Sequence, residues 1–265
     1  MLDIKELADS FDARATTYGQ NEWHRRTAER LVELCRLQAG HCVMDAATGT
    51  GFAALAAAQR VGGEGHVCGL DISSGMLKEA RAAVERCGLA NVAFIQSDAT
   101  HVPAYGTASF DVITCAAGLL YMPVANALRE WHRLLKRGGL VAFSTMKAGS
   151  PPAGRIFRDC AARRGLSLRD PSEPLGSVSA CRSVLEAAEF DVEDIVSESV
   201  SFSAQDLTLA WESNSRSAGH EEVRRLSNQE QSALKNAYLH ALAREEDDHP
   251  GALSQAEILY AFARR

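Results

Sequence analysis

The stretch from Val43 to Phe52 constrains the fold of this chain more than any other. It reads Val-Met-Asp-Ala-Ala-Thr-Gly-Thr-Gly-Phe, an apolar run that reaches the carboxylate Asp45 and then turns through two glycines. Gly49 and Gly51 permit a left-handed backbone and a close ligand, because they lack a Cβ. The N–H groups of a helix that begins near Gly51 would add partial positive charge. The stretch therefore predicts a strand, a tight turn and a helix beside a ligand.

Strands and helices alternate regularly after this turn. The hydrophobic pattern predicts strands at 41–45, 66–71, 92–96, 110–115 and 140–146, with helices after Gly51, at 73–86 and at 123–136. Such alternation predicts right-handed βαβ units and a parallel sheet in an α/β fold. Beyond residue 147 strands and helices no longer alternate regularly. We expect helices there at 154–164, 179–188, 205–214 and 229–246 and strands within 190–203 and at 257–263.

Three acids stand at the ends of the first three expected strands. They are Asp45, Asp71 and Asp98. Ligands of open parallel sheets bind at the carboxyl ends of the strands, so these acids should face one crevice. Asp71 is placed to accept both hydroxyls of a ribose, and Asp98 could accept a hydrogen bond from an adenine amine. Asp45 would repel a pyrophosphate but favour a sulfonium or ammonium group.

Composition and charge indicate which kind of molecule this protein binds. The chain has 265 residues, 46% of them apolar, and a formal net charge of −6 with scattered lysines and arginines. These values predict a folded, soluble protein that acts on a small molecule and does not bind nucleic acid. No apolar run approaches the ~18 residues of a membrane span. The seven cysteines show no metal-ligand spacing, so we expect reduced thiols, no metal and a cytoplasmic location.

Several segments together resemble one enzyme family, the class I S-adenosylmethionine-dependent methyltransferases. The similarity is to its ubiquinone/menaquinone-biosynthesis-like group, which acts on small molecules. The matching segments lie within 40–146 and are Val43–Phe52, Gly69–Ser73 with Met76, Ser97–Ala99, Ser109–Ile113 and Leu134–Leu140. The opening Phe11–Tyr18 is also similar to the N-terminal lid of that group. Ala47 departs from the pattern, since many members have glycine there. The alanine suggests slightly less space for the cofactor at this turn.

The resemblance implies an architecture. The expected fold is a Rossmann-like, doubly wound sheet of seven strands, mostly parallel, with an antiparallel C-terminal strand. A single domain would span 1–265. Within it, 1–36 would form a helical lid, 40–146 the cofactor-binding core, and 147–180 and 204–250 the segments that cap the substrate.

The resemblance also implies cofactor-binding residues, on the lid, the glycine turn and the strand ends. They are Tyr18, Asp45, Ala46, Gly49, Gly51, Asp71, Ile72, Met76, Ser97, Asp98, Ala99, Cys115 and Ala116. Asp71 would hold the ribose, and Asp98 with Ala99 would contact the adenine. Cys115 and Ala116, just past the fourth strand, would lie beside the methionine portion and the reacting methyl. The cofactor would be S-adenosylmethionine, with S-adenosylhomocysteine as product.

Methyl transfer needs few catalytic groups. It is an in-line displacement, in which an enzyme mainly aligns the acceptor and excludes water, and a base helps only an acceptor that carries a proton. His24, just after the lid, is the first candidate for the base, and Tyr121 should line the acceptor pocket. A surface histidine and a core tyrosine are the alternatives for these two. His101, His220 and His240 are the other candidates.

Three functions are compatible with the sequence. The leading hypothesis is methyl transfer from S-adenosylmethionine to an O, N or C atom of a small molecule. A second is a non-methylating S-adenosylmethionine-binding protein or cyclase on the same fold. The third is an NAD-dependent oxidoreductase, because Gly49-x-Gly51-x-x-Ala54 satisfies a loose dinucleotide fingerprint. Asp45 and the lack of a dehydrogenase-like constellation disfavour it. The sequence does not specify the acceptor, and a homo-oligomer is compatible with it.

Overall fold

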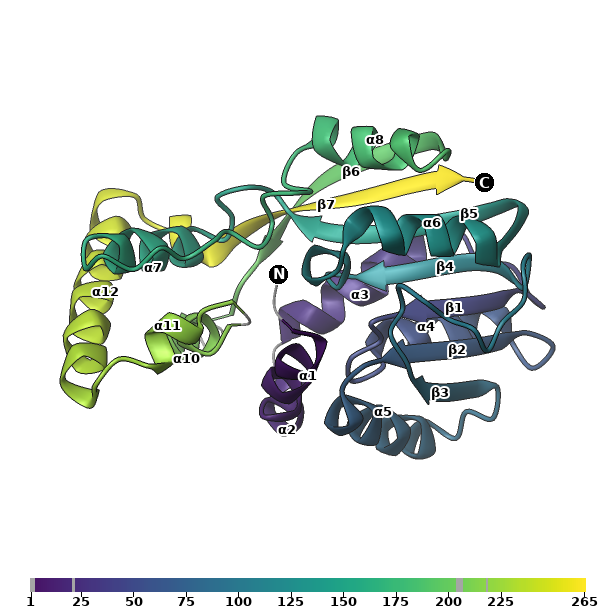
Figure 1. Cartoon of the computed structure of the whole chain (residues 1–265), viewed down its shortest axis with the longest axis horizontal. Coiled ribbons are helices and arrows are strands. Elements are labelled where there is room, and N and C mark those ends of the chain that lie inside the picture. The colour runs from purple at the N-terminus through teal and green to yellow at the C-terminus, as the bar shows by residue number, and fades with distance from the viewer. Residues whose placement is uncertain (1–2, 21, 204–206, 218) are drawn as a thin grey trace.

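A seven-stranded sheet forms the centre of the molecule (Figure 1). The computed structural model describes residues 3–20, 22–203, 207–217 and 219–265. The sheet order is β3-β2-β1-β4-β5-β7-β6. Its strands are β1 (Cys42–Ala46), β2 (His66–Asp71), β3 (Val92–Gln96), β4 (Phe110–Ala116), β5 (Leu135–Met146), β6 (Asp191–Ser201) and β7 (Gln255–Arg264). The first five strands pair in parallel, and β7 lies antiparallel between β5 and β6. The predicted fold class is confirmed.

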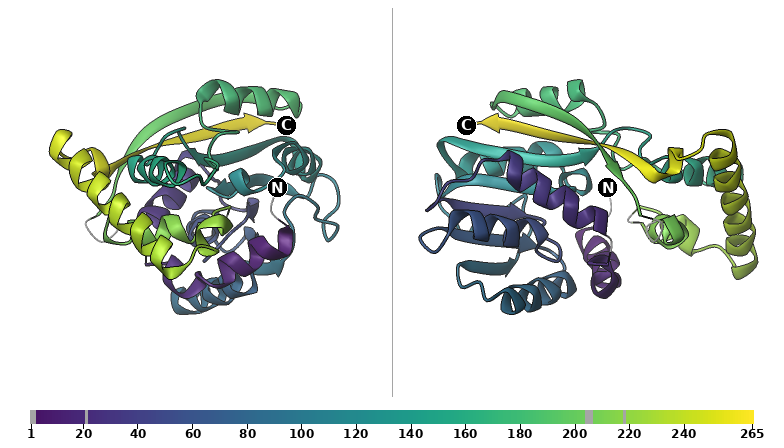
Figure 2. Two further views of the ribbon diagram at one scale, coloured as in Figure 1. Left: turned by 60° about the vertical axis from the view of Figure 1, so that its left-hand side comes forward. Right: turned by 180° about the vertical axis from the view of Figure 1, so that it is seen from behind.

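Helices cover both faces of this sheet (Figure 2). Those that follow the chain through the core are α1 (Ile4–Asp12), α2 (Ala15–Tyr18), α3 (Glu22–Leu34), α4 (Phe52–Val61), α5 (Ser74–Cys87), the short 3₁₀ helix η1 (Leu119–Tyr121), α6 (Val124–Leu134) and α8 (Val178–Ala187). Helices α3 and α4 pack together on one face, while α6 and α8 pack together on the other. Helices α1 and α2 pack against α5, which brings the N-terminal segment to the edge of the sheet near β3.

Alternating strand residues supply the two hydrophobic cores. Val43 and Val112 belong to the cluster beneath α3 and α4, whereas their neighbours Met44 and Ile113 belong to the cluster beneath α6. All four are almost completely buried. This is the period-two alternation of a strand that is covered on both sides.

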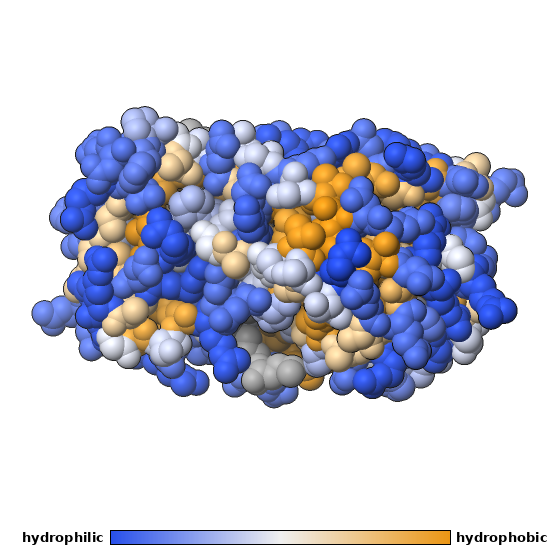
Figure 3. Space-filling model, turned by 90° about the horizontal axis from the view of Figure 1, so that it is seen from above, coloured by the Kyte–Doolittle hydropathy of each residue, from blue (hydrophilic) through white to orange (hydrophobic). Residues whose placement is uncertain are grey.

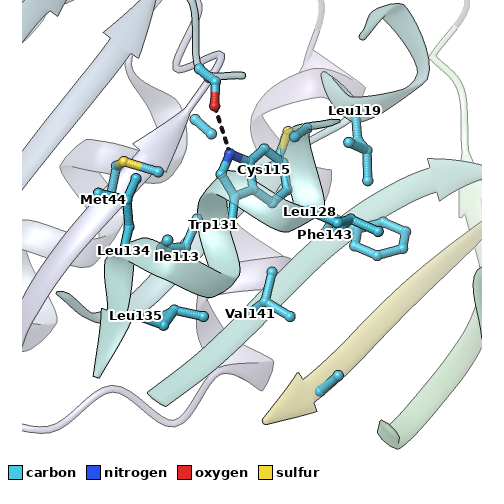
Figure 4. Packing of buried hydrophobic residues seen from close by; sticks show 14 of the residues in the cluster. Met44, Ile113, Cys115, Leu119, Leu128, Trp131, Leu134, Leu135, Val141 and Phe143 are labelled. Carbon is cyan, nitrogen blue, oxygen red and sulfur yellow. Dashed lines mark hydrogen bonds between the residues drawn. The ribbon is translucent and has the colours of Figure 1, made fainter. Parts of the chain in front are cut away.

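Trp131 fixes α6 against the sheet (Figure 4). Its ring is fully buried, and its Nε1–H donates a hydrogen bond to the carbonyl oxygen of Ala99 at 2.9 Å. A buried indole needs such a partner for its only polar atom. The bond ties α6 to the loop after β3, and so to one wall of the crevice described below.

A helical module extends beyond the carboxyl ends of the core strands (Figures 1 and 2). We define it as α7 (Pro152–Ala162), α10 (Ala210–Ser215), α11 (Glu221–Arg224), α12 (Asn228–Asp248) and the 3₁₀ helix η2 (Ala252–Ser254). It has its own hydrophobic cluster, centred on the buried side chains of Phe157, Leu234 and Tyr238. The chain enters it after β5, and a second time between β6 and β7.

Three details differ from the expected elements. Strand β5 begins at Leu135, not at 140, because Leu135 already pairs with Phe110 and Gly138 turns with φ 74° inside the strand. Helix α11 was not expected. Of the helix expected at 205–214, residues 205 and 206 lie outside the described residues, and α10 begins only at Ala210.

The surface seen from above is mostly hydrophilic, with apolar residues gathered near the middle of that face (Figure 3). Ile4, Val178 and Leu239 are the large apolar side chains that the described part of the chain leaves exposed. The seven cysteines are all free thiols. Within the described ranges, no helix has the length and apolar character that crossing a membrane requires.

Candidate active site

The strand order reverses between β1 and β4, since β2 and β3 continue to one side of β1 and β5 lies beyond β4. The carboxyl ends of strands at such a point form the usual ligand crevice of doubly wound sheets. Three neighbouring cavities occupy this crevice.

The first, the strand-end cavity, has a volume of about 200 Å³. Its floor is the glycine turn and the ends of β2, β3 and β4, and helix α1 covers it with Ile4, Leu7 and Phe11. Of the expected cofactor residues it is lined by Tyr18, Gly49, Asp71, Ile72, Met76, Ser97, Asp98, Ala99 and Ala116. The fold thus brings most of the cofactor-binding residues that the sequence predicts to one cavity.

The second, the wide cavity, has a volume of about 350 Å³ and lies between the core and the helical module. A small connecting cavity of about 40 Å³ lies under the glycine turn. Tyr18 and Ala117 line all three cavities, and Phe11 and Tyr121 line both of the larger ones. The cavities therefore meet at these four residues.

The glycine turn has the conformation that its sequence predicts. Gly49 and Gly51 have φ values of 55° and 90°. A Cβ on Gly51 would lie 2.9 Å from Leu55 Cδ1 and 3.1 Å from Ala80 Cβ. Position 51 therefore requires glycine, because its backbone is left-handed and its surroundings leave no room for a Cβ. Gly51 packs inward, however, and lines none of the three cavities.

Asp45 supports the turn from below. Its Oδ2 accepts a hydrogen bond from Thr48 Oγ1 at 2.6 Å, and its Oδ1 accepts one from Thr114 Oγ1 at 2.8 Å. The side chain is 1% exposed, and this burial raises its pKa to about 6, although the two hydroxyls oppose the shift. Asp45 lines only the connecting cavity, so the structure places it behind the turn rather than in the strand-end cavity.

Asp71 lies at the floor of the strand-end cavity. Its Oδ2 accepts from the Gly49 N–H at 2.8 Å and its Oδ1 from the Ser73 N–H at 2.9 Å. Burial raises its pKa, and these backbone bonds oppose the shift. Each carboxylate oxygen has more than one lone pair and can accept a further hydrogen bond. Two adjacent hydroxyls, as on a ribose, match these acceptors.

Asp98 lines the same cavity. Its Oδ1 accepts from the Thr100 N–H at 2.8 Å, and the apolar side chains of Ile72 and Met76 line the same cavity. A carboxylate beside apolar side chains suits a flat base that carries an amine. The donor and acceptor chemistry of this cavity therefore fits an adenosine moiety.

Asp12 is a residue whose role the sequence did not indicate. Its Oδ1 accepts from Ser73 Oγ at 2.5 Å and from the Gly75 N–H at 2.7 Å. Ser73 is fully buried and also caps α5, because its Oγ accepts from the Met76 N–H. The last turn of α1 is thereby fastened to the first turn of α5, two residues after Asp71. Its only sequence signal was its position in the Phe11–Tyr18 opening.

Two expected residues require correction. Cys115 belongs to β4 itself, which continues to Ala116, and its fully buried side chain packs in the core beneath α6. Ala46, also fully buried, packs in the same core. Neither lines a cavity, because alternation along a strand directs their side chains inward. Ala116 and Ala117 occupy the place expected for Cys115.

The two expected catalytic residues both line the wide cavity. The His24 ring stacks on the Tyr18 ring with centroids 4.3 Å apart and an interplanar angle of 8°. His24 lines the wide and connecting cavities. Tyr121, on η1, lines both larger cavities and packs edge-on against Phe11 at 5.4 Å, and burial raises its pKa.

The other three histidine candidates differ in their exposure and in whether they line a cavity. His101 and His240 are exposed and line none of the three cavities. His220 is 3% exposed and lines the wide cavity from the helical module. Its Nδ1 lies 2.7 Å from the carbonyl oxygen of Asn214, and burial lowers its pKa. A neutral His220 would therefore donate from Nδ1 to that carbonyl.

Comparisons with known proteins agree with this geometry. Residues 43–139 match the family model described as a methyltransferase domain. The chain is 32% identical over 153 residues to the aklanonic acid methyltransferase DauC of Streptomyces sp. (strain C5), covering 56% of this chain and 69% of that protein. The chain belongs to the S-adenosylmethionine-dependent methyltransferase family. S-adenosylmethionine is the cofactor of this family, which confirms the cofactor predicted from the sequence.

A second relative is the demethylmenaquinone methyltransferase of Listeria welshimeri, 34% identical over 156 residues. That alignment covers 58% of this chain and 65% of the relative. The chain thus spans about two thirds of the length of the curated relatives that it matches.

Solved structures share the fold. A putative methyltransferase from Bacillus halodurans superposes with a TM-score of 0.62 at 22% identity, covering 89% of this chain and 97% of that one. The [4+2]-cyclase SpnF superposes with a TM-score of 0.57 at 23% identity, covering 89% of this chain and 80% of that one. Such identities show the fold alone.

Proposed function

We propose that this chain transfers the methyl group of S-adenosylmethionine to an O, N or C atom of a small molecule held in the wide cavity. The observation that supports this most directly is the meeting of the strand-end and wide cavities at Tyr18 and Ala117. A cofactor in one cavity and an acceptor in the other would have their reacting atoms at this junction.

The strand-end cavity would hold the cofactor. Asp71 would accept the ribose hydroxyls, Asp98 the adenine amine, and Ile72 and Met76 would flank the base. Gly49 would leave room for the methionine portion. When bound, the cofactor supplies an electrophilic methyl group on a sulfonium sulfur.

The wide cavity would orient the acceptor and exclude water, which are the main requirements of a displacement of this kind. Several aromatic side chains surround its end near the junction: Phe11, Tyr18, Trp23, Tyr121 and Phe202. Trp23 and Phe202 pack edge to face at 5.5 Å. These walls favour a planar, carbon-rich acceptor. His24 would take the proton of an acceptor that carries one.

Two measurements test this proposal. Calorimetry should show S-adenosylhomocysteine binding and no binding of NAD, and tight NAD binding would contradict the proposal in favour of an oxidoreductase. Incubation with methyl-labelled S-adenosylmethionine and a panel of planar phenols, quinols and carboxylic acids should give labelled product and S-adenosylhomocysteine in equal amounts. Turnover that S-adenosylhomocysteine sustains equally well would show a non-methylating cyclase instead.

A further inference from the structure

Arg14 is a cation at the junction of the two larger cavities. It lies between α1 and α2 and lines the wide cavity together with Tyr18 and Tyr121. Its guanidinium carbon lies 4.6 Å from the centre of the Phe11 ring, and its Nε–H donates to the Ser10 carbonyl oxygen at 3.2 Å. The guanidinium is therefore held in place at two points.

One end of this guanidinium has no hydrogen-bond partner among the described residues. Arg14 Nη2 is buried and makes no hydrogen bond, and Arg14 forms no ion pair with any acid in the described ranges. A buried N–H group without an acceptor is costly, and a charged one more so. Such a group in a cavity wall is expected where a ligand supplies the acceptor.

Asp12 and the described acids that line the wide cavity have other partners. Asp12, two residues before Arg14, is bound to α5 as described above. In the wide cavity, Asp170 pairs with Arg158 at 2.6 Å and Glu212 lies 3.9 Å from Lys235. Among the described residues, therefore, no carboxylate pairs with Arg14.

Two phenol groups share the neighbourhood of this cation. Arg14 interacts electrostatically with both Tyr18 and Tyr121, and in each case its positive charge lowers the tyrosine pKa against the larger effect of burial. The two tyrosines also interact with each other. The guanidinium and two phenol hydroxyls thus gather where the cavities meet.

We propose that Arg14 binds a carboxylate of the acceptor, so that the wide cavity is specific for a planar carboxylic acid. This inference rests on the proposed function, because it assigns the substrate class of the same site. An arginine fork matches a carboxylate with two parallel hydrogen bonds, and a lysine cannot reproduce this geometry. Tyr18 and Tyr121 are additional donors for the same oxygens.

The test compares an acid with its neutral isostere. Calorimetry on the protein saturated with S-adenosylhomocysteine would measure the binding of 2-naphthoate and of 2-naphthamide. The wild type should bind the acid at least tenfold more tightly than the amide. Arg14→Gln should abolish this preference, because it weakens the binding of the acid and leaves the binding of the amide unchanged. Arg14→Lys should retain part of the preference. Arg25→Gln, which removes an exposed arginine paired with Glu22 and Glu29, is the matched control and should change neither affinity.

Three outcomes would overturn the inference. They are failure of the wild type to bind 2-naphthoate, equal binding of acid and amide, and an acid preference that survives in Arg14→Gln. Failure of the proposed function is distinguishable from all three, because S-adenosylhomocysteine itself would then not bind.

A second measurement needs no acceptor. If the unpaired guanidinium serves a ligand, Arg14→Met should leave the melting temperature of the ligand-free protein unchanged or raise it, because a buried unpaired cation is removed. A drop of more than about 4 °C would assign Arg14 a structural role.

Discussion

Gly118 leaves room for the methyl group of Ala47. A Cβ built on Gly118 would lie 2.6 Å from the Cβ of Ala47 and 3.0 Å from Cys115 Sγ. Ala47 itself has φ 52°, in the left-handed region that favours glycine. The alanine that departs from the family pattern, just after β1, is therefore accommodated by a glycine after β4.

This relationship predicts a coupled pair of substitutions. Gly118→Ala should destabilise the protein by about 1–3 kcal/mol through overpacking. Ala47→Gly should be neutral or stabilising, because the left-handed backbone is then relaxed. In urea unfolding, the double variant should recover part of the loss, but not all of it, since Cys115 still obstructs a Cβ at 118. Additive effects would show that the two positions do not interact.

Asp71 is predicted to be the main polar contact of the cofactor. Asp71→Asn keeps the shape but removes one acceptor oxygen and the charge, so the affinity for S-adenosylhomocysteine should fall about tenfold or more, at about 1.4 kcal/mol per tenfold. Calorimetry measures this. Asp191→Asn, at an exposed position of β6, is the control and should bind like the wild type. Equal affinities in both variants would remove Asp71 from the cofactor site.

The bond network of Asp12 predicts that α1 closes the cofactor cavity. Asp12→Ala leaves Ser73 Oγ and the Gly75 N–H without this acceptor, which should loosen α1 and weaken S-adenosylhomocysteine binding several-fold. Limited proteolysis should then cut the N-terminal 20 residues faster, and added ligand should protect them less. Asp9→Ala changes the same helix at an exposed position paired with Lys5 and should have neither effect.

The raised pKa of Asp45 predicts a pH dependence of stability. The folded-state pKa of about 6 lies above the ordinary 3.8, so the folded state binds the proton more tightly than the unfolded state. The stability that this contributes is present below pH 3.8 and is lost as the pH rises through 6. At pH 7.5, Asp45→Asn should therefore be more stable than the wild type by up to about 3 kcal/mol. The difference should shrink toward zero near pH 4, and a difference that is constant with pH would contradict this account.

His24 and Tyr121 are predicted to act on the acceptor and not on the cofactor. With an acceptor identified by the labelled-methyl assay, His24→Ala should reduce kcat by about 10²-fold or more if a proton must be removed. Tyr121→Phe should also lower turnover. Both should bind S-adenosylhomocysteine as the wild type does, and His240→Ala, on the exposed face of α12, should change nothing. Unchanged rates in both variants would remove these residues from the site.

The sheet and the strand-end cavity were predictable because local signals specify them. Apolar runs, glycine turns and acids at strand ends fix where Asp71 and Asp98 lie, since parallel strands bring their carboxyl ends to one edge. The inward direction of Cys115 was equally accessible in principle. It was missed because the end of β4 was placed one residue early, and alternation makes a single residue decisive.

The acceptor side was not predictable in the same way. Arg14 and Tyr18 of the N-terminal segment, Tyr121 and His220 come from three separate segments, and only tertiary packing brings them to one cavity. Nothing in the local sequence around Arg14 shows that its guanidinium forms no ion pair with the acids that the structure describes. That property belongs to the folded chain.

In the described chain, the helical module joins the core after β5, before α8, after β6 and before β7, whereas the family match spans 43–139 and ends before the module begins. Selection can therefore lengthen, shorten or replace the module without disturbing Gly49, Asp71 or Asp98. One cofactor-binding core can in this way be combined with many different acceptor-binding modules. For engineering, grafting at Met146, Val178, Ser201 and Gln255 offers a route to exchange acceptor range as a unit.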